Sequence, residues 1–195
     1  MQSYIKVKLL QFHTLTSGRI LNYCFTKKES ASPLGELFKY KTNDGSLSLY
    51  SNDFQESFHS KSGAFDEATN KFLIPAELDR FRSGEKLFVL DICVGLGYNS
   101  ALILEEAEKR SIKLEWWGLE IDSRPLKIAL NEPEFTKNWS PNVIAILNEI
   151  HKEGFWDFGN SKGKLLWGDA RHQLENIPRT IKADLILLDA FSPNH

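Results

Sequence analysis

Cysteines and long apolar runs are both scarce in this 195-residue sequence. The two cysteines, Cys24 and Cys93, lie far apart and match no CxxC or metal-ligand spacing, which excludes a disulfide scaffold and predicts a reduced, cytoplasmic setting. No apolar run approaches the roughly 20 residues that span a bilayer. Lys6 and Lys8 interrupt the apolar residues near the start, which argues against a secretory signal peptide. The five histidines show no metal-binding spacing either, so we predict neither a membrane nor a metal partner.

The sequence also lacks a strong excess of charge of one sign. Its formal net charge is −2, and its hydrophobic fraction of 42% is enough for a sizeable core. The charge is uneven, because residues 1–41 carry a balance of +5 and the remainder a balance of −7. A domain this acidic is expected to bind nucleic acid weakly without help, since phosphate contacts need clustered Lys and Arg.

The chain divides into three zones. Residues 1–40 show weak periodicity and are predicted to be a weakly structured extension. The remainder, 41–195, is predicted to be one domain that starts with a hairpin and helix region over 41–83. In that region Asn43-Asp44-Gly45 indicates a hairpin turn, and residues 65–72 indicate a short amphipathic helix.

From residue 84 onward, short apolar segments alternate with helical patterns. Such alternation predicts an α/β fold in which a mostly parallel sheet is covered by helices on both faces. The expected strands are 87–91, 114–120, 164–167 and 183–189, and the expected helices are 98–110, 124–131 and 141–152.

A glycine-rich turn follows the first of these strands. Asp91 ends the strand, and Gly95 and Gly97 then allow the backbone to pass close to a bound ligand. Glu120 ends the second strand, where a carboxylate can accept hydrogen bonds from ribose hydroxyls. This pattern fits both a dinucleotide and an adenosyl ligand.

Acidic residues also follow the other two strands. Asp169, in Gly168-Asp169-Ala170, could accept a hydrogen bond from an adenine amine, and Asp189 closes the last strand. Ligands of open α/β sheets bind at the carboxyl ends of the strands, so the four acids together predict a ligand site. Each acid taken singly could instead cap the helix that follows it.

This arrangement resembles the Rossmann-like methyltransferases that use S-adenosylmethionine. Within them, the sequence from about Thr42 onward resembles the MnmC-like family, which completes the 5-methylaminomethyl group of the tRNA wobble uridine. The resemblance rests on four segments, at 42–50 (TNDGSLSLY), 58–64 (FHSKSGA), 94–99 (VGLGYN) and 188–193 (LDAFSP).

The resemblance implies roles for the residues of the site. Asp91, Gly95, Gly97 and Glu120 would hold the methionyl and ribose parts of S-adenosylmethionine, and Asp169 with Ala170 would meet the adenine. The turn residues Cys93 and Tyr98 complete the predicted cofactor site. Asp189 would be catalytic, facing the transferable methyl group and the substrate amine, and tRNA would be the partner.

Two features depart from the family pattern. Cys93 occupies the position of the first glycine of the turn. Its small side chain is either tolerated there or lowers the affinity for the cofactor. A free cysteine also packs well as a small buried apolar residue. The chain stops at His195, just after the fourth predicted strand, whereas these methyltransferases continue through three more. The sequence therefore predicts a core that lacks its C-terminal strands and leaves an apolar edge strand.

Three functions remain open at this point. The first is methyl transfer from S-adenosylmethionine to the amine of an aminomethyl-uridine, with Asp189 orienting the amine and accepting its proton. The second is a spermidine-synthase-like aminopropyltransferase. The third is a catalytically silent remnant that binds a cofactor or a partner chain.

Other residues also have two readings. His59 and Ser60 could belong to a lid over the cofactor or to a polar loop. The tryptophans could offer surfaces for base stacking, although the three on predicted strands favour core packing; those three are Trp116, Trp117 and Trp167.

Overall fold

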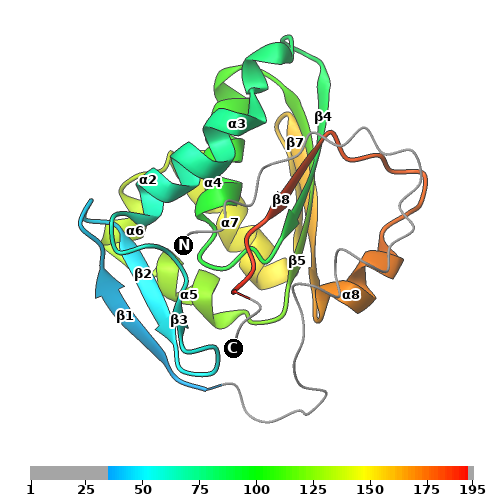
Figure 1. Cartoon of the computed structure of the whole chain (residues 1–195). Coiled ribbons are helices and arrows are strands. Elements are labelled where there is room, and N and C mark those ends of the chain that lie inside the picture. The colour runs from blue at the N-terminus through cyan, green and yellow to red at the C-terminus, as the bar shows by residue number, and fades with distance from the viewer. Residues whose placement is uncertain (1–34, 193–195) are drawn as a thin grey trace.

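The computed structural model describes residues 35–192. The predictions that fall on residues 1–34, including Cys24 and most of the extension, and on residues 193–195 lie outside the described residues. The described part contains a small antiparallel sheet and a larger, mostly parallel sheet (Figure 1).

The small sheet has the strand order β1-β2-β3, with β1 at Leu37–Lys41, β2 at Leu47–Ser51 and β3 at Glu56–Ser57. The predicted hairpin is confirmed as the antiparallel pair β1 and β2. Asp44 closes its turn by accepting hydrogen bonds from Thr42 Oγ1 at 2.6 Å and from the Ser46 amide at 2.9 Å. β1 begins at Leu37, inside the range assigned to the extension, because pairing with the apolar strand β2 orders a segment whose own pattern is weak.

A run of short helices connects this sheet to the core. It comprises α2 (Ala64–Ala68), the π-helical turn η1 (Thr69–Leu73), α3 (Ile74–Ala76) and the 3-10 turn η2 (Leu78–Arg80). The predicted helix at 65–72 is thus confirmed and extends further along the chain. α2 and η1 both contact α4 of the core, so this region lies against the helical layer.

The large sheet has the strand order β6-β7-β5-β4-β8. Its strands are β4 (Lys86–Ile92), β5 (Lys113–Glu120), β6 (Phe155–Phe158), β7 (Ser161–Trp167) and β8 (Leu185–Leu188). All neighbours pair in parallel except β6 and β7. From β4 the chain moves outward through β5 to the edge strand β6, turns back into β7, and then returns to β8 on the other side of β4. The order of strands therefore reverses next to β4, which is where α/β sheets bind ligands.

The strand β6 was missed by the sequence analysis. It forms a hairpin with β7 across Gly159-Asn160, and Gly159 has φ +64°. A Gly-Asn pair between two apolar segments is a hairpin signal, but the helix that ends at Glu153 leaves only a short strand there, which hides the alternation.

Helices cover both faces of the large sheet, as predicted. α4 (Tyr98–Lys109), α5 (Arg124–Leu130), α6 (Pro133–Thr136) and α7 (Pro141–Glu153) lie on one side, and α8 (Ala170–Gln173) with the turn η3 (Leu174–Asn176) lies on the other (Figure 1). α4 is buried almost all round because it lies between the sheet and the α2–η1 segment. Of the three tryptophans expected in the core, Trp116 is buried, whereas Trp117 and Trp167 are half-buried and pack against the two apolar clusters from their edges. Trp139 and Trp156 are also buried, at most 8% exposed.

Candidate active site

The glycine-rich turn links β4 to α4 through residues with a left-handed backbone. Gly95 and Gly97 have φ values of +58° and +91°. A Cβ atom on Gly97 would lie 3.0 Å from Leu126 Cδ1, so this position needs glycine both for its φ value and for space. The turn therefore brings the backbone and the start of α4 to the carboxyl end of β4.

Cys93 has φ +67° in the same turn. This value is uncommon for a residue with a side chain, and it explains why glycine suits the position. The Cys93 side chain is half-buried and packs against an apolar cluster on the α8 side of the sheet, formed by Leu90, Ile92, Leu119 and Ala170. The sequence-based expectation of hydrophobic packing therefore agrees with the structure.

Asp91 is completely buried at the end of β4. Ser100 Oγ donates a hydrogen bond to its Oδ2 atom at 2.6 Å, and Oδ1 has no hydrogen-bond partner among the described residues. Burial, together with the charges of Asp189 and Glu120, raises the pKa of Asp91 to about 7. The Trp116 indole N–H lies near this carboxyl group and favours its ionised form, although it makes no hydrogen bond of ordinary geometry with Oδ1.

Glu120 holds the glycine-rich turn in place from the end of β5. Its Oε2 atom accepts a hydrogen bond from the Gly95 amide at 2.8 Å, and its Oε1 atom accepts from the amides of Ile121 and Asp122 at 2.7 and 2.9 Å. Burial raises its pKa, while these hydrogen bonds oppose the rise. A carboxylate has about four lone-pair sites, so Glu120 keeps capacity for one more donor.

Asp189 follows β8 and lies beside the start of α4. Asn99 Nδ2 donates a hydrogen bond to Asp189 Oδ2 at 2.9 Å, and the Asp189 amide donates to the Ile92 carbonyl at 3.2 Å. The side chain is partly buried, and burial raises its pKa to about 6. Asp91, Glu120 and Asp189 therefore share one region at the carboxyl edge of the sheet.

Asp169 is engaged differently from the other three acids. It caps α8 by accepting a hydrogen bond from the Arg171 amide at 2.9 Å, and it forms an ion pair with the Arg171 guanidinium. The hydrogen bonds from Arg171 lower the pKa of Asp169. Ala170 is buried at the first position of α8. The two residues follow β7 as predicted, but the Asp169 carboxylate already has a cationic partner.

Tyr98 serves packing inside the protein. It is 1% exposed, and its hydroxyl donates to the Leu47 carbonyl at 3.0 Å and accepts from the Leu47 amide at 3.1 Å. Its ring also meets the His59 ring edge-on at 5.2 Å. The Tyr98 side chain therefore joins the small sheet to α4, which leaves only its backbone near the turn.

The loop after β8 is fastened to the small sheet. Phe191 stacks on Phe54 with ring centroids 4.4 Å apart and meets Phe58 edge-on at 4.8 Å. Ser192 donates two hydrogen bonds to Glu56, both at 2.7 Å. The position of Asp189 thus depends on β3 as well as on β8.

His59 and its neighbours lie on the same side of the site. Its Nδ1 atom is 3.1 Å from Ser48 Oγ, and burial lowers its pKa to about 4. The Ser60 amide donates to Glu67 at 2.6 Å, and Glu67 forms an ion pair with Lys71. His59 and Ser60 are therefore tied into the packed structure by these contacts.

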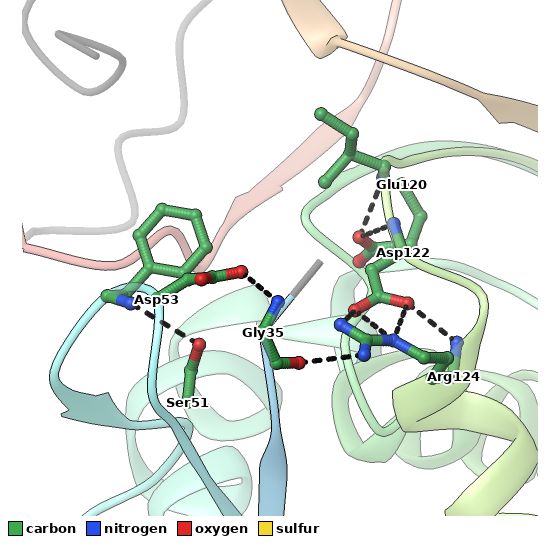
Figure 2. Close-up of polar contacts among 8 residues, drawn as sticks. Gly35, Ser51, Asp53, Glu120, Asp122 and Arg124 are labelled. Carbon is green, nitrogen blue, oxygen red and sulfur yellow. Dashed lines mark hydrogen bonds and ion pairs between the residues drawn. The ribbon is translucent and has the colours of Figure 1, made fainter. Parts of the chain in front are cut away.

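Gly35, two residues before β1, contacts both the small sheet and the start of α5, as Figure 2 shows. The Gly35 amide donates to Asp53 at 2.5 Å, and the Gly35 carbonyl accepts from Arg124 at 2.8 Å. Arg124 is held in turn by Asp122. These contacts link the small sheet to the loop that follows β5.

Two cavities of about 330 Å³ each lie away from Asp91 and Asp189. One is lined by residues of α4, α7 and the β6–β7 hairpin, and the other by Ile121, Ser123, His151 and Trp167. Within residues 35–192, no group of three His, Cys, Asp or Glu side chains could hold a metal ion. No helix in the same range is long and apolar enough to cross a membrane.

Sequence reasoning missed two residues beside the predicted acids. Asn99 contacts Asp189, and Ile121, directly after Glu120, leaves 59% of its surface exposed. A large apolar side chain exposed next to a predicted ribose-binding acid is a usable signal in retrospect, whereas nothing in the sequence indicates the pairing of Asn99 with a residue 90 positions away.

Comparison with known proteins agrees with this geometry. No protein-family model matches the sequence. An uncharacterised protein of Methanocaldococcus jannaschii is 32% identical over 159 residues, which is 78% of this chain and 41% of that protein. The tRNA 5-methylaminomethyl-2-thiouridine biosynthesis bifunctional protein MnmC of an Azoarcus species is 30% identical over 159 residues, or 74% of this chain and 24% of that protein. The chain therefore spans less than half the length of these curated relatives.

A solved structure shows the same similarity in three dimensions. The crystal structure of MnmC2 from Aquifex aeolicus matches with a TM-score of 0.65 and 26% identity, over 82% of this chain and 51% of that one. In sequence and in fold, the chain is therefore an MnmC-like protein with a Rossmann-like methyltransferase fold.

Proposed function

We propose that the protein is a cytoplasmic methyltransferase that uses S-adenosylmethionine to methylate the amine of an aminomethyl-uridine at the tRNA wobble position. The observation that carries this proposal is the gathering of Asp91, Glu120 and Asp189 around a glycine-rich turn of positive φ. The named function of the Azoarcus relative, which concerns a tRNA 5-methylaminomethyl nucleoside, supports the choice of substrate.

The residues of the turn fit S-adenosylmethionine. The Asp91 carboxyl group has a buried oxygen without a donor, which suits a nearby ammonium group, and Glu120 retains capacity for a ribose hydroxyl. Gly95 and Gly97 allow the positive φ values by which the backbone of the turn passes the carboxyl end of β4. The exposed face of Ile121 offers an apolar surface for a flat base. When bound, the cofactor supplies a methyl group on a positively charged sulfur.

Asp169 takes a smaller part in this proposal than the sequence alone implied. Because Arg171 donates hydrogen bonds to both oxygens of its carboxylate, a contact with the adenine amine would require part of the Asp169–Arg171 pair to open. The adjoining Ala170 would contribute a small, uncrowded surface near the base.

Asp189 is the residue that we assign to proton transfer. A substrate amine must be neutral to attack a methyl group, and it loses a proton once the new N–C bond has formed. With a pKa raised to about 6, Asp189 is mostly ionised at neutral pH yet close enough to that pH to accept a proton. Its hydrogen bond with Asn99 and the fastened loop beyond it fix its direction.

Two measurements test the proposed function. Calorimetric titration with S-adenosylmethionine should show binding, and transfer of a radiolabelled methyl group to tRNA from cells that lack this modification should show turnover. Asp189→Asn should keep cofactor binding and reduce turnover by about 10²- to 10⁴-fold. Binding without any transfer by the unaltered chain would favour a silent remnant, and absence of binding would refute the proposal.

A further inference from the structure

Asn99 stands out among the buried polar side chains of the site. It is 5% exposed in the first turn of α4, directly after the glycine-rich turn. Its Nδ2 atom donates to Asp189 Oδ2 at 2.9 Å, whereas its Oδ1 atom is buried with no partner among the described residues. Most buried side-chain polar atoms have a partner, so an amide that leaves its oxygen unpaired is unusual.

The orientation of this amide follows from its neighbour. With the amide turned over, the Asn99 oxygen would face the Asp189 carboxylate, and two acceptors would oppose each other. The observed orientation therefore satisfies Asp189 and leaves the asparagine oxygen without a donor. An asparagine whose only role was to hydrogen-bond nearby backbone groups would use both its side-chain oxygen and its side-chain nitrogen.

We propose that Asn99 is a positioning residue that holds the Asp189 carboxylate in its reactive orientation and keeps it ionised. This inference rests on the proposed methyltransferase function. Asn99 belongs to the helix that begins at the cofactor turn, and Asp189 belongs to the strand end that faces the substrate amine. The hydrogen bond therefore fixes the position of Asp189, on the proposed substrate side, relative to α4, on the proposed cofactor side.

The charges around Asp189 show why it depends on this amide. Burial favours the neutral form of Asp189, and Glu67 on α2 adds a repulsive negative charge. Asp91 on β4 is a further acid in electrostatic contact with it. Lys71 on η1 and the Asn99 amide favour the ionised form, but Lys71 is already paired with Glu67. Asn99 is thus the neutral donor that contacts the Asp189 carboxylate directly.

The test is Asn99→Leu, with Asn99→Ala as a second variant in case the larger side chain disturbs packing. Loss of a hydrogen bond to a charged group corresponds to a rise of about one to two units in the pKa of Asp189. Methyl transfer should then fall by about 2- to 10-fold at pH 7 and recover near pH 9. The matched control is Asn142→Leu, because Asn142 Nδ2 donates to Glu108 at 2.9 Å on the protein surface and should leave the pH profile unchanged.

A second readout does not need turnover. Carbon-13 NMR of labelled aspartate carboxyl groups, with the Asp189 signal identified by its loss in Asp189→Asn, measures the pKa of Asp189 directly. A rise in both Asn99 variants supports the proposal even if the unaltered protein transfers no methyl group, a result that would count against the proposed function alone. An Asp189 pKa that stays unchanged in both Asn99 variants would overturn the role of Asn99 and leave the proposed function standing.

Discussion

Replacing Asp91 with asparagine should change how the stability of the protein depends on pH. The folded protein raises the pKa of this carboxyl group from 3.8 to about 7. A raised pKa means that the folded state holds the proton more tightly than the unfolded chain. The contribution to stability is therefore fully present below pH 3.8 and is lost as the pH rises through about 7.

The size of the effect follows from the shift. A rise of roughly three pKa units, at about 1.4 kcal/mol per unit, corresponds to about 4 kcal/mol. No correction for solvent screening is needed, since Asp91 is completely buried. The cost grows as the unfolded chain ionises above pH 3.8 and is complete above about pH 7, where an ionised carboxylate remains in the core.

The assay is urea unfolding at pH 4, 6 and 8 without cofactor. Between pH 4 and pH 8, the free energy of unfolding of Asp91→Asn should rise by about 4 kcal/mol relative to that of the unaltered protein. Comparing the two proteins at each pH isolates the effect of Asp91 together with its coupling to Asp189 and Glu120. Asp157→Asn, at an exposed position on β6, is the control. Parallel pH dependences for Asp91→Asn and the unaltered protein would refute this reasoning.

Three further substitutions probe the turn and the small sheet. Cys93→Gly should stabilise the protein by about 1 kcal/mol, because it removes the strain of a side chain at φ +67°; a lower midpoint of thermal unfolding would contradict this. Gly97→Ala should lower the free energy of unfolding by about 2 kcal/mol or more, because a Cβ atom there combines positive φ with a 3.0 Å contact. Gly159→Ala is the control, and it should cost less in the same urea titration because the space around Gly159 is open. Tyr98→Phe should cost about 1–3 kcal/mol by leaving the Leu47 backbone groups without their partner, and an unchanged urea midpoint would show that the small sheet docks without that hydroxyl.

The sequence supports prediction of most of the large sheet and its helices. The strands β4 and β8 contain continuous apolar segments, and α5 and α7 carry a proline in their first turn, Pro125 and Pro141. Local signals of this kind depend only on neighbouring residues. The antiparallel strand β6 and the early start of β1 could not be predicted in the same way, because each is ordered by pairing with another strand.

The part of the candidate site that could be predicted is the part that follows from the order of the strands along the chain. Acids at the ends of parallel strands meet at one edge, and this topology brings Asp91, Glu120 and Asp189 together. Side-chain partners follow from packing in three dimensions. The capping of α8 by Asp169 is the alternative that the sequence left open. Nothing in the sequence indicates that Tyr98 turns toward Leu47 or that Asn99 contacts Asp189.

The two hydrogen bonds between Ser192 and Glu56 have a consequence for the order in which the chain folds. The two residues are 136 positions apart, and β8 pairs with β4 across nearly the whole length of the core. Contacts of such long range form slowly and late, because much of the chain must be ordered before they can close. During synthesis at about 5–20 residues per second, the ribosome releases the turn and its helix several seconds before Asp189 emerges. The glycine-rich turn and α4 can therefore fold before Asp189, the residue to which we assign proton transfer, leaves the ribosome.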